Sequence, residues 1–376
     1  MKVLLPLIII VCLAACTPSP TTTTVEAPPK ENETPQWIHY PGKAGDGAGK
    51  HIVFISGDEE YRSEEALPML GRILADHHGF DCTILFAQHP DTPGIVNPNY
   101  LNHIPGLDEL EDADLAFMFT RFRELPDAQM QHIDNFLKGG KPIIGIRTAT
   151  HAFNIKDTTS QWMHYSNFYA KEGDPWDGGF GRAILGEKWV SHHGHHKHQS
   201  TRGLPAPGNE SHPILSGIEA GAIWGPTDVY GVRLPLPGDS EPIVLGQVVD
   251  RPGEFDEEDL FYGMRPEDTE IAGIDPEKPE KGNPNDPMMP IAWTKSYEVP
   301  GGEQGKAFAS TIGSSTDLLN EGVRRMYVNA VHYLLGMEVP EAANVEIVGA
   351  YNPTPYEFRS DNYWTDKQMQ VAAYQP

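Results

Sequence analysis

The alternation of strand-like and helix-like segments between residues 51 and 146 constrains the fold more than any other feature. Residues 51–56 read His-Ile-Val-Phe-Ile-Ser, a β-branched and aromatic run typical of a buried strand. A helix should begin at Ser63, because acidic residues suit its first turn and apolar residues then recur at helical spacing. Further elements are predicted as strands at 82–86, 115–119 and 142–146 and as a helix at 127–137. Strands that alternate with helices predict an α/β fold with a mostly parallel sheet and helices on both faces.

The second half of the chain is less regular. Residues 156–208 show no clear periodicity and are rich in Trp, Tyr, Gly and His, so we expect a long, His-rich functional insertion or lid. Strand-like runs follow at 229–234, 243–249, 290–293 and 307–312. A helix at 320–335 carries an apolar stripe at helical spacing. We therefore predict one domain over residues 49–340 and an extended C-terminal tail over 341–376.

The N-terminus resembles a bacterial lipoprotein signal. Lys2 precedes an apolar run that is too short for a stable membrane span, and Leu13-Ala-Ala-Cys16 follows directly. This pattern predicts a signal peptide over residues 1–15, lipidation of Cys16 and a lipid-anchored location in the bacterial cell envelope, in the periplasm or at the cell surface. An ordinary cleaved signal is the alternative. Residues 16–48 should form a disordered tether, since Thr, Pro and Glu dominate its first half.

The cysteine and charge content limits which disulfides the chain can form and which molecules it can bind. Cys12 falls in the predicted signal and Cys16 at the lipidation site, so Cys82 has no partner for an intramolecular disulfide. The chain has 28 Lys and Arg against 53 Asp and Glu, a formal charge of −25. Because such a surface repels phosphate backbones, we expect no nucleic acid partner.

A histidine-rich run lies inside the predicted insertion. It contains five imidazoles within seven residues: His192, His193, His195, His196 and His198. Imidazole titrates near neutral pH and is the commonest metal ligand, so the run favours acid/base chemistry or metal binding. A solvated polar loop is the alternative.

Three polar loops follow predicted strands of the sheet. They are Asp58–Arg62, Thr120–Arg123 and Arg147–His151. Ligands of open α/β sheets bind outside the carboxyl ends of the strands, so the three loops predict a shared site at one edge.

With these segments in view, the sequence resembles the ThuA-like (trehalose-utilisation) family over about residues 49–340. The resemblance rests on the order of five motifs: Ile55-Ser-Gly-Asp58, Gly145-Ile-Arg-Thr-Ala-Thr-His151-Ala-Phe, Ser211-His-Pro-Ile214, Thr227-Asp-Val-Tyr230 and Gly305-Lys-Ala-Phe-Ala-Ser-Thr-Ile-Gly313. It implies a flavodoxin-like sheet, as in class I glutamine amidotransferases, and a role in handling sugars or oxidised sugar derivatives.

Two departures from these families matter. Amidotransferases place a cysteine after the strand at 143–146, where this sequence has Arg147, so a glutaminase activity is not expected. ThuA-like chains commonly have Gly-His after the late strand, where this sequence has Gly313-Ser314. If that histidine takes part in the chemistry of the family, another group must replace it here, and the histidine run is the candidate.

These observations give a set of candidate residues and two classes of function. The candidate catalytic residues are His151, His192, His193, His195, Asp58 and Glu59. The candidate substrate-binding residues are Tyr61, Arg62, Arg121, Arg123, Arg147, Trp189, Arg202, Asp228 and Tyr230. One hypothesis is an enzyme of hydrolase or lyase type that acts on a carbohydrate or keto-sugar by histidine acid/base catalysis. The other is a non-catalytic carbohydrate-binding surface lipoprotein.

A metal-assisted version of the enzyme hypothesis remains open. No cofactor is certain, but His192, His195 and His151 could hold a divalent metal such as zinc with an open water position. For either mechanism, we expect at least one of His192, His193 and His195 to lie within hydrogen-bonding or shared-metal distance of His151, Asp58 or Arg121, with Trp189 beside them.

Overall fold

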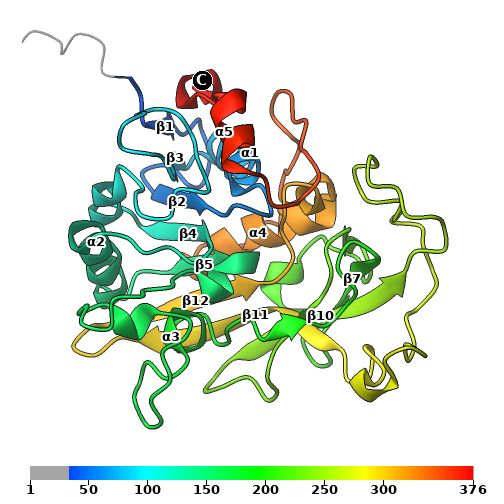
Figure 1. The fold of residues 1–376 in the computed structure, drawn as a ribbon. Coiled ribbons are helices and arrows are strands. Elements are labelled where there is room, and N and C mark those ends of the chain that lie inside the picture. Colours follow the sequence, from blue (N-terminus) through cyan, green and yellow to red (C-terminus); the bar gives the residue numbers. More distant parts are fainter. Residues whose placement is uncertain (1–33, 376) are drawn as a thin grey trace, which may run out of the picture. The chain divides into compact units, whose positions relative to one another are not determined.

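A ten-stranded mixed sheet forms the centre of residues 34–375, the part of the chain that the computed structural model describes (Figure 1). Its strand order is β1-β3-β2-β4-β5-β12-β11-β10-β7-β8. The strands are β1 Trp37–Tyr40, β2 His51–Gly57, β3 Asp81–Phe86, β4 Leu115–Thr120, β5 Ile143–Ile146, β7 Gln199–Pro205, β8 Ile223–Gly225, β10 Glu241–Asp250, β11 Met289–Glu298 and β12 Gln304–Ser310.

Strand direction divides the sheet into two halves. Strands β3, β2, β4, β5 and β12 are parallel, whereas β1, β11, β10, β7 and β8 join antiparallel to their neighbours. The prediction of a mostly parallel sheet was therefore wrong for the second half. The connection from β11 to β12 is a five-residue turn, and such a short connection can join only antiparallel strands.

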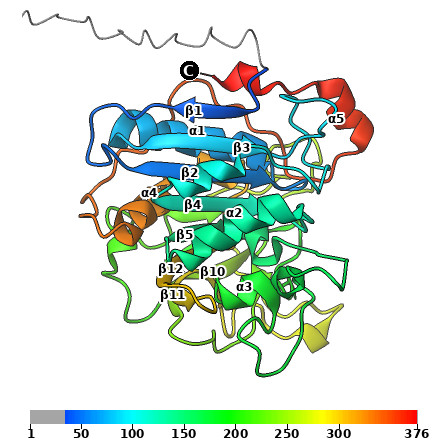
Figure 2. The same ribbon diagram turned by 90° about the vertical axis from the view of Figure 1, so that its left-hand side faces the viewer.

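Helices cover both faces of the sheet, as predicted. Helices α1 Ser63–His78 and α4 Glu321–Leu334 pack on one face, and α2 Asp127–Lys138 and α3 Gly179–Ala183 on the other (Figure 2). Side chains of β2 alternate between them, because Phe54 joins the core of α1 and α4 while Ile55 joins the core of α2 and α3. The remaining helices are short: α5 Asp361–Lys367 and the 3-10 turns η1 Leu107–Glu111, η2 Arg147–His151, η3 Met163–Tyr165, η4 Pro213–Leu215, η5 Pro279–Lys281, η6 Asp317–Leu319 and η7 Val371–Tyr374.

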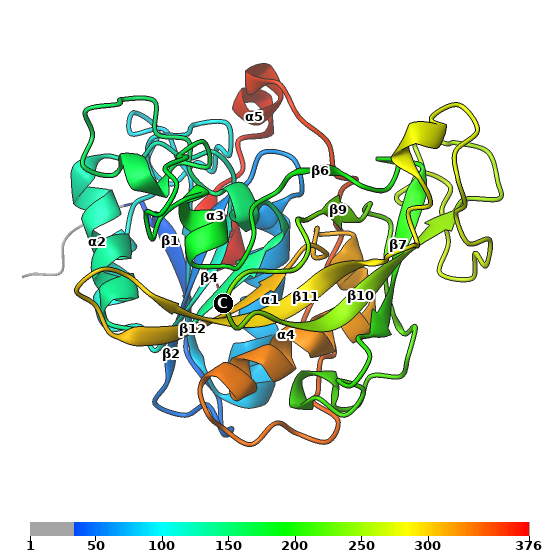
Figure 3. The ribbon, with the colours of Figure 1, turned by 90° about the horizontal axis from the view of Figure 1, so that it is seen from below.

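The histidine run connects a small second sheet to the large one. Strand β6, Ser191–His192, pairs antiparallel with β9, Tyr230–Gly231 (Figure 3). The run continues from β6 into β7, which belongs to the central sheet, so the predicted insertion ends in a core strand rather than in a loop. The strand predicted at 229–234 shrinks to β9, since prolines at 235 and 237 limit the pairing beyond it.

Both ends of the predicted domain need correction. Strand β1 lies in the predicted tether over 16–48, where it pairs with β3 and buries Ile38 completely. The alternation in Trp37-Ile-His-Tyr40 explains this pairing, because one face of the strand is apolar. The predicted signal at 1–15, Cys16 and the tether up to residue 33 lie outside the described residues.

The C-terminal segment is folded rather than an extended tail. It contains α5 and η7, and its side chains Tyr356, Trp364 and Val371 are buried in the core of α1 and α4. The aromatic residues of this segment are widely spaced among prolines and acidic residues, so helix or strand periodicity could not predict their burial. Within residues 34–375, none of the helices has the length and apolar character that crossing a bilayer requires.

Candidate functional site

The three polar loops meet at the carboxyl edge of β2, β4 and β5, as predicted. Hydrogen bonds join them, because the backbone N–H of Arg121 donates to Gly57 O at 2.9 Å and that of Phe122 to His151 O at 3.0 Å. Each loop holds one non-glycine residue in the left-handed region, with φ of 62° at Arg62, 49° at Phe122 and 44° at Arg147. Such backbone strain persists only where surrounding contacts enforce it, and it concentrates at functional sites.

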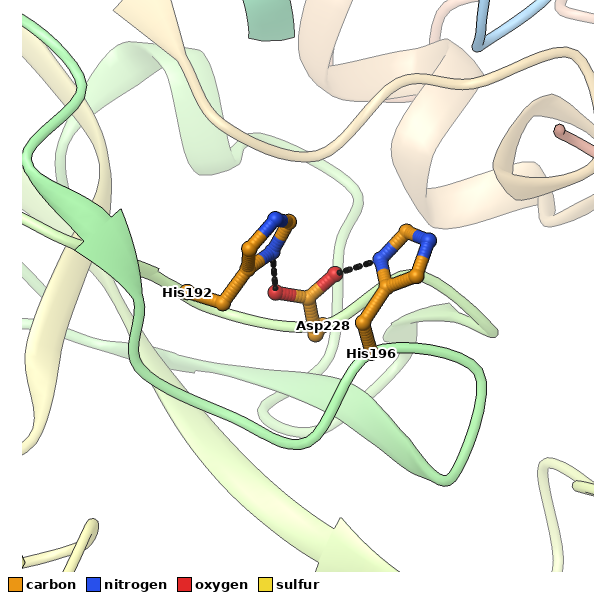
Figure 4. Close-up of side chains that lie close together, drawn as sticks. All are labelled: His192, His196 and Asp228. Carbon is orange, nitrogen blue, oxygen red and sulfur yellow. Dashed lines mark hydrogen bonds and ion pairs between the residues drawn. The ribbon is translucent and has the colours of Figure 1, made fainter. Parts of the chain in front are cut away.

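A buried carboxylate, Asp228, binds two histidines of the run. His192 Nδ1 lies 2.8 Å from Asp228 Oδ2, and His196 Nδ1 lies 3.0 Å from Oδ1 (Figure 4). We call these three residues the Asp228 group. Burial alone would raise the pKa of Asp228, but hydrogen bonds from His192 and His196 and the charge of Arg147 hold it well below its usual value. The carboxylate therefore stays ionised and fixes both rings by their Nδ1 atoms.

Arg147 supports this carboxylate from within the core. Its guanidinium is fully buried between the rings of Tyr61 and Tyr230, at 4.0 and 4.2 Å from their centroids. It donates to Asp228 Oδ1 at 3.1 Å, to Asp228 O at 3.2 Å and to Thr311 O. In this arrangement Arg147 is a positioning residue, since buried partners occupy the guanidinium that was predicted to bind substrate.

Asp317 holds the turn that carries Asp228. Its carboxylate accepts hydrogen bonds from Thr227 Oγ1 at 2.7 Å and from the backbone N–H groups of Gly313 and Ser314, each at 2.8 Å. Ser314, which stands where a ThuA-like resemblance leads us to expect histidine, is buried after β12, where its backbone N–H binds Asp317. The turn therefore braces Asp228, while the histidines come from the run.

Glu60 is a candidate that the sequence analysis did not select. Its side chain is buried, and its Oε1 lies 3.5 Å from Nε2 of His196. Burial and the neighbouring charge of Asp58 raise the pKa of Glu60 to about 7. A carboxyl group that titrates near neutral pH can serve as a general acid or base. Asp58, Glu59 and Glu60 are consecutive acidic residues, and the sequence alone does not show which of them faces the histidines.

Asp58 and Glu59, both predicted to be catalytic, hold the loops together in this structure. Asp58 Oδ1 accepts from the backbone N–H groups of Glu60, at 2.9 Å, and Tyr61, and its Oδ2 accepts from Thr148 Oγ1 at 2.6 Å. Glu59 forms ion pairs with Arg121 and, at 2.8 Å, with Arg123. These internal partners occupy both carboxylates.

Other predicted residues lie apart from the Asp228 group. His193 Nε2 is 2.7 Å from Pro284 O, and the His195 ring stacks on His198 with 4.2 Å between centroids. Arg202 donates to Pro266 O and Asp268 O, and buried Arg62 donates to Glu59 O and Glu357 O. Contact of a run histidine with His151, Asp58 or Arg121 was predicted, but the hydrogen bond of His192 goes to Asp228, and His193 and His195 point to other partners.

His151 and Trp189 extend the site along the sheet edge. The Trp189 ring lies 5.5 Å from the His151 ring and 5.7 Å from the His192 ring, so it stands beside both, as predicted for its contact with the run. Burial, together with the charges of Arg121, Arg147 and His192, lowers the pKa of His151 well below its usual value. His151 is therefore neutral at neutral pH and can accept or donate a hydrogen bond without carrying charge.

The geometry also changes the predicted metal set. His192, His196 and Asp228 each offer one ligand atom, and these atoms lie within 4.8 Å of one another. The metal set predicted from the sequence was His192 with His195 and His151 instead. Two surface cavities of about 460 and 380 Å³ are lined by other residues, around Arg324 and around His212, and include no member of the Asp228 group.

Comparisons with known proteins add one family name. No family model and no curated protein matches this chain. Among solved structures, it is similar to one from Bacteroides uniformis at 14% identity and a TM-score of 0.44, covering 78% of this chain and 95% of that one. A structure from Parabacteroides merdae is similar at 11% identity and a TM-score of 0.43, covering 82% and 97% of the two chains. Both are described as a "putative ThuA-like protein".

These neighbours carry the ThuA-like name that the sequence motifs predicted.

Proposed function

We propose that this chain is a ThuA-like protein of the bacterial cell envelope that transforms a carbohydrate derivative, such as a keto-sugar, by proton transfer at the Asp228 group. The observation that carries the proposal is the pair of imidazoles held by one buried carboxylate at the carboxyl edge of the sheet. In the same proposal, the parallel strands β3-β2-β4-β5-β12 correspond to a flavodoxin-like core of the glutamine amidotransferase type. The residue after β5 is the buried Arg147 rather than a cysteine, which speaks against amidotransferase chemistry.

In this proposal each side chain has a role. Since ionised Asp228 accepts the Nδ1–H of each ring, Nε2 becomes the free basic atom of both imidazoles. The half-exposed His192 then removes a proton from the carbon next to a carbonyl group of the substrate. The electrons of that C–H bond form an enolate. Its collapse restores the carbonyl, forms a new C=C bond and expels the glycosidic oxygen, which takes a proton from Glu60, while His196 Nε2, 3.5 Å from Glu60 Oε1, positions that carboxyl group. This is a lyase-type opening of a keto-glycoside, and addition of water to its product gives net hydrolysis.

Paired histidine variants test this function. His192→Ala and His196→Ala should each lower kcat on the converted substrate by about 100-fold or more, because general acid/base groups contribute about 10²- to 10⁴-fold. His193→Ala is the matched control, since its ring is bonded to Pro284 O, and its kcat should stay within about twofold of the wild type. The substrates to screen are disaccharides and their 3-keto derivatives. Undiminished turnover by His192→Ala would refute the assignment. Ligand binding without turnover in every form would favour the carbohydrate-binding alternative.

A metal-assisted mechanism is the second candidate, because two imidazoles and a carboxylate match a zinc site that leaves one position open. Elemental analysis of the purified protein distinguishes the two. The mechanism is metal-assisted if the wild type holds stoichiometric zinc that Asp228→Asn loses, and if a chelator removes the activity and zinc restores it. Full activity in metal-free protein would exclude it.

A further inference from the structure

Three phenylalanine side chains gather at the outer end of the candidate site. Phe122 follows β4, Phe168 lies between η3 and α3, and Phe358 precedes α5. The rings of Phe122 and Phe168 are stacked with 5.9 Å between centroids. The guanidinium of Arg121 lies 4.7 Å from the Phe122 ring and 4.8 Å from the Phe358 ring, so it joins the third ring to the other two. We call these three rings the phenylalanine platform.

The platform leaves large apolar groups in water. Phe168 is 61% exposed and Phe358 is 54% exposed. A single exposed apolar side chain is ordinary, whereas two exposed rings that are joined through Phe122 and Arg121 form a contiguous patch that marks a binding surface. Burying a phenylalanine side chain contributes roughly 1.5–3 kcal/mol of favourable free energy, so a ligand that covers these rings gains binding free energy.

The platform is continuous with the Asp228 group. The Phe122 ring lies 5.0 Å from the His151 ring, His151 lies 5.5 Å from Trp189, and Trp189 lies 5.7 Å from His192. An unbroken row of rings therefore leads from the exposed phenylalanines to the histidine assigned as the base. A ligand with one end at His192 would place its other end along this row.

We propose that the phenylalanine platform binds the flat aromatic aglycone of an aryl glycoside whose sugar occupies the Asp228 group. The location of the sugar rests on the proposed function, whereas the aromatic specificity rests on the platform itself. Phenylalanine offers a flat apolar face and no hydrogen-bonding atom, which suits an aromatic ring better than a second sugar with its rim of hydroxyl groups. Arg121 is already paired with Glu59, which leaves it less free to serve such hydroxyls.

The test compares three probes on the full-length protein: methyl β-glucoside, phenyl β-glucoside and free 4-nitrophenol. Calorimetry should show that the wild type binds the phenyl glucoside about tenfold more tightly than the methyl glucoside, as expected for one aromatic stacking contact. Phe168→Ala and Phe358→Ala should remove this preference without changing affinity for the methyl glucoside. Phe255→Ala is the matched control, because Phe255 is 42% exposed but stacks on His198 instead.

The third probe separates this inference from the proposed function. If neither glucoside binds but saturation-transfer NMR detects 4-nitrophenol in a manner that depends on Phe168 and Phe358, the platform stands and the carbohydrate proposal fails. If the wild type binds both glucosides equally, if Phe255→Ala causes the same loss, or if no aromatic probe contacts the platform, the inference is overturned.

Discussion

Asp228 combines two roles, and a single substitution should remove both. Asp228→Asn removes the charge that orients His192 and His196, and it also leaves the buried Arg147 guanidinium without its carboxylate. Breaking one partner of a buried ion pair costs about 3–5 kcal/mol. We expect a loss of this size in the free energy of unfolding, measured in urea. Asp366→Asn is the control, since Asp366 is exposed, and equal stability of the two variants would contradict the role given to Arg147.

The carboxyl group of Glu60 should make stability depend on pH. Its pKa rises from 4.5 to about 7 on folding, so the folded protein holds this proton more tightly than the unfolded chain. The stabilisation from this group is therefore fully present below pH 4.5 and is lost as the pH rises through about 7.

Glu60→Gln should remove this component. Between pH 4.5 and 8, the wild type should lose about 2–3 kcal/mol more unfolding free energy than the variant, measured by urea unfolding across the range. Parallel pH profiles for the two proteins would show that Glu60 keeps an ordinary pKa.

Residue types and strand ends predicted part of the site. His192, Asp228, Tyr230 and Trp189 meet at the predicted edge. Glu60 and His196 escaped selection, although both lie in segments that the sequence analysis singled out. A left-handed residue follows each of them, Lys197 directly after His196 and Arg62 two residues after Glu60, and no sequence pattern predicts such a backbone conformation.

At the level of elements, β1 tests whether the segment before residue 49 belongs to the fold. Ile38 is fully buried, whereas its neighbour His39 points to solvent. Ile38→Ala should lower the free energy of unfolding by about 2–5 kcal/mol, and His39→Ala by less than about 0.5 kcal/mol. Equal, small effects in thermal or urea unfolding would restore the tether interpretation.

Helix α5 offers the same comparison at the other end of the chain. Trp364 is 1% exposed and lies against Arg62, with 5.0 Å from the guanidinium to the ring. Trp364→Ala should cost about 3–5 kcal/mol, while Asp366→Ala in the same helix should have little effect. A Trp364→Ala protein as stable as its Asp366→Ala counterpart would mean that the C-terminal segment is only loosely attached.

Long periodic elements were predictable from the sequence, and short ones were not. The predicted helix at 320–335 is α4, and the predicted strand at 51–56 is β2, each within one residue at either end. Strand β1 and helix α5 are stabilised by burial against distant segments, so their own residues carried too little pattern to reveal them. The antiparallel pairing of the second half of the sheet was also not predicted, because an apolar pattern does not show in which direction neighbouring strands run.

For the whole molecule, the untested expectation is the lipid anchor. Cys16→Ser should abolish labelling by a radiolabelled fatty acid in cells and release the protein from the membrane fraction, because Cys16 would carry the lipid. Cys82→Ser is the control, since Cys82 is buried in β3 and cannot be acylated in the folded protein. Unchanged labelling of the Cys16→Ser protein would remove the anchor from the proposal.

The C-terminal segment packs against residues that are synthesised much earlier. Tyr40 donates a hydrogen bond to Tyr374 O, 334 residues away, and the Tyr61 ring stacks on Tyr356. During synthesis, the first strands therefore leave the ribosome long before their cover exists. Contacts so distant in sequence close slowly, because loop-closure entropy must be overcome before they form. The early strands should therefore expose apolar surface until residues 356–374 are made, and a chain truncated before residue 356 should bind chaperones rather than fold.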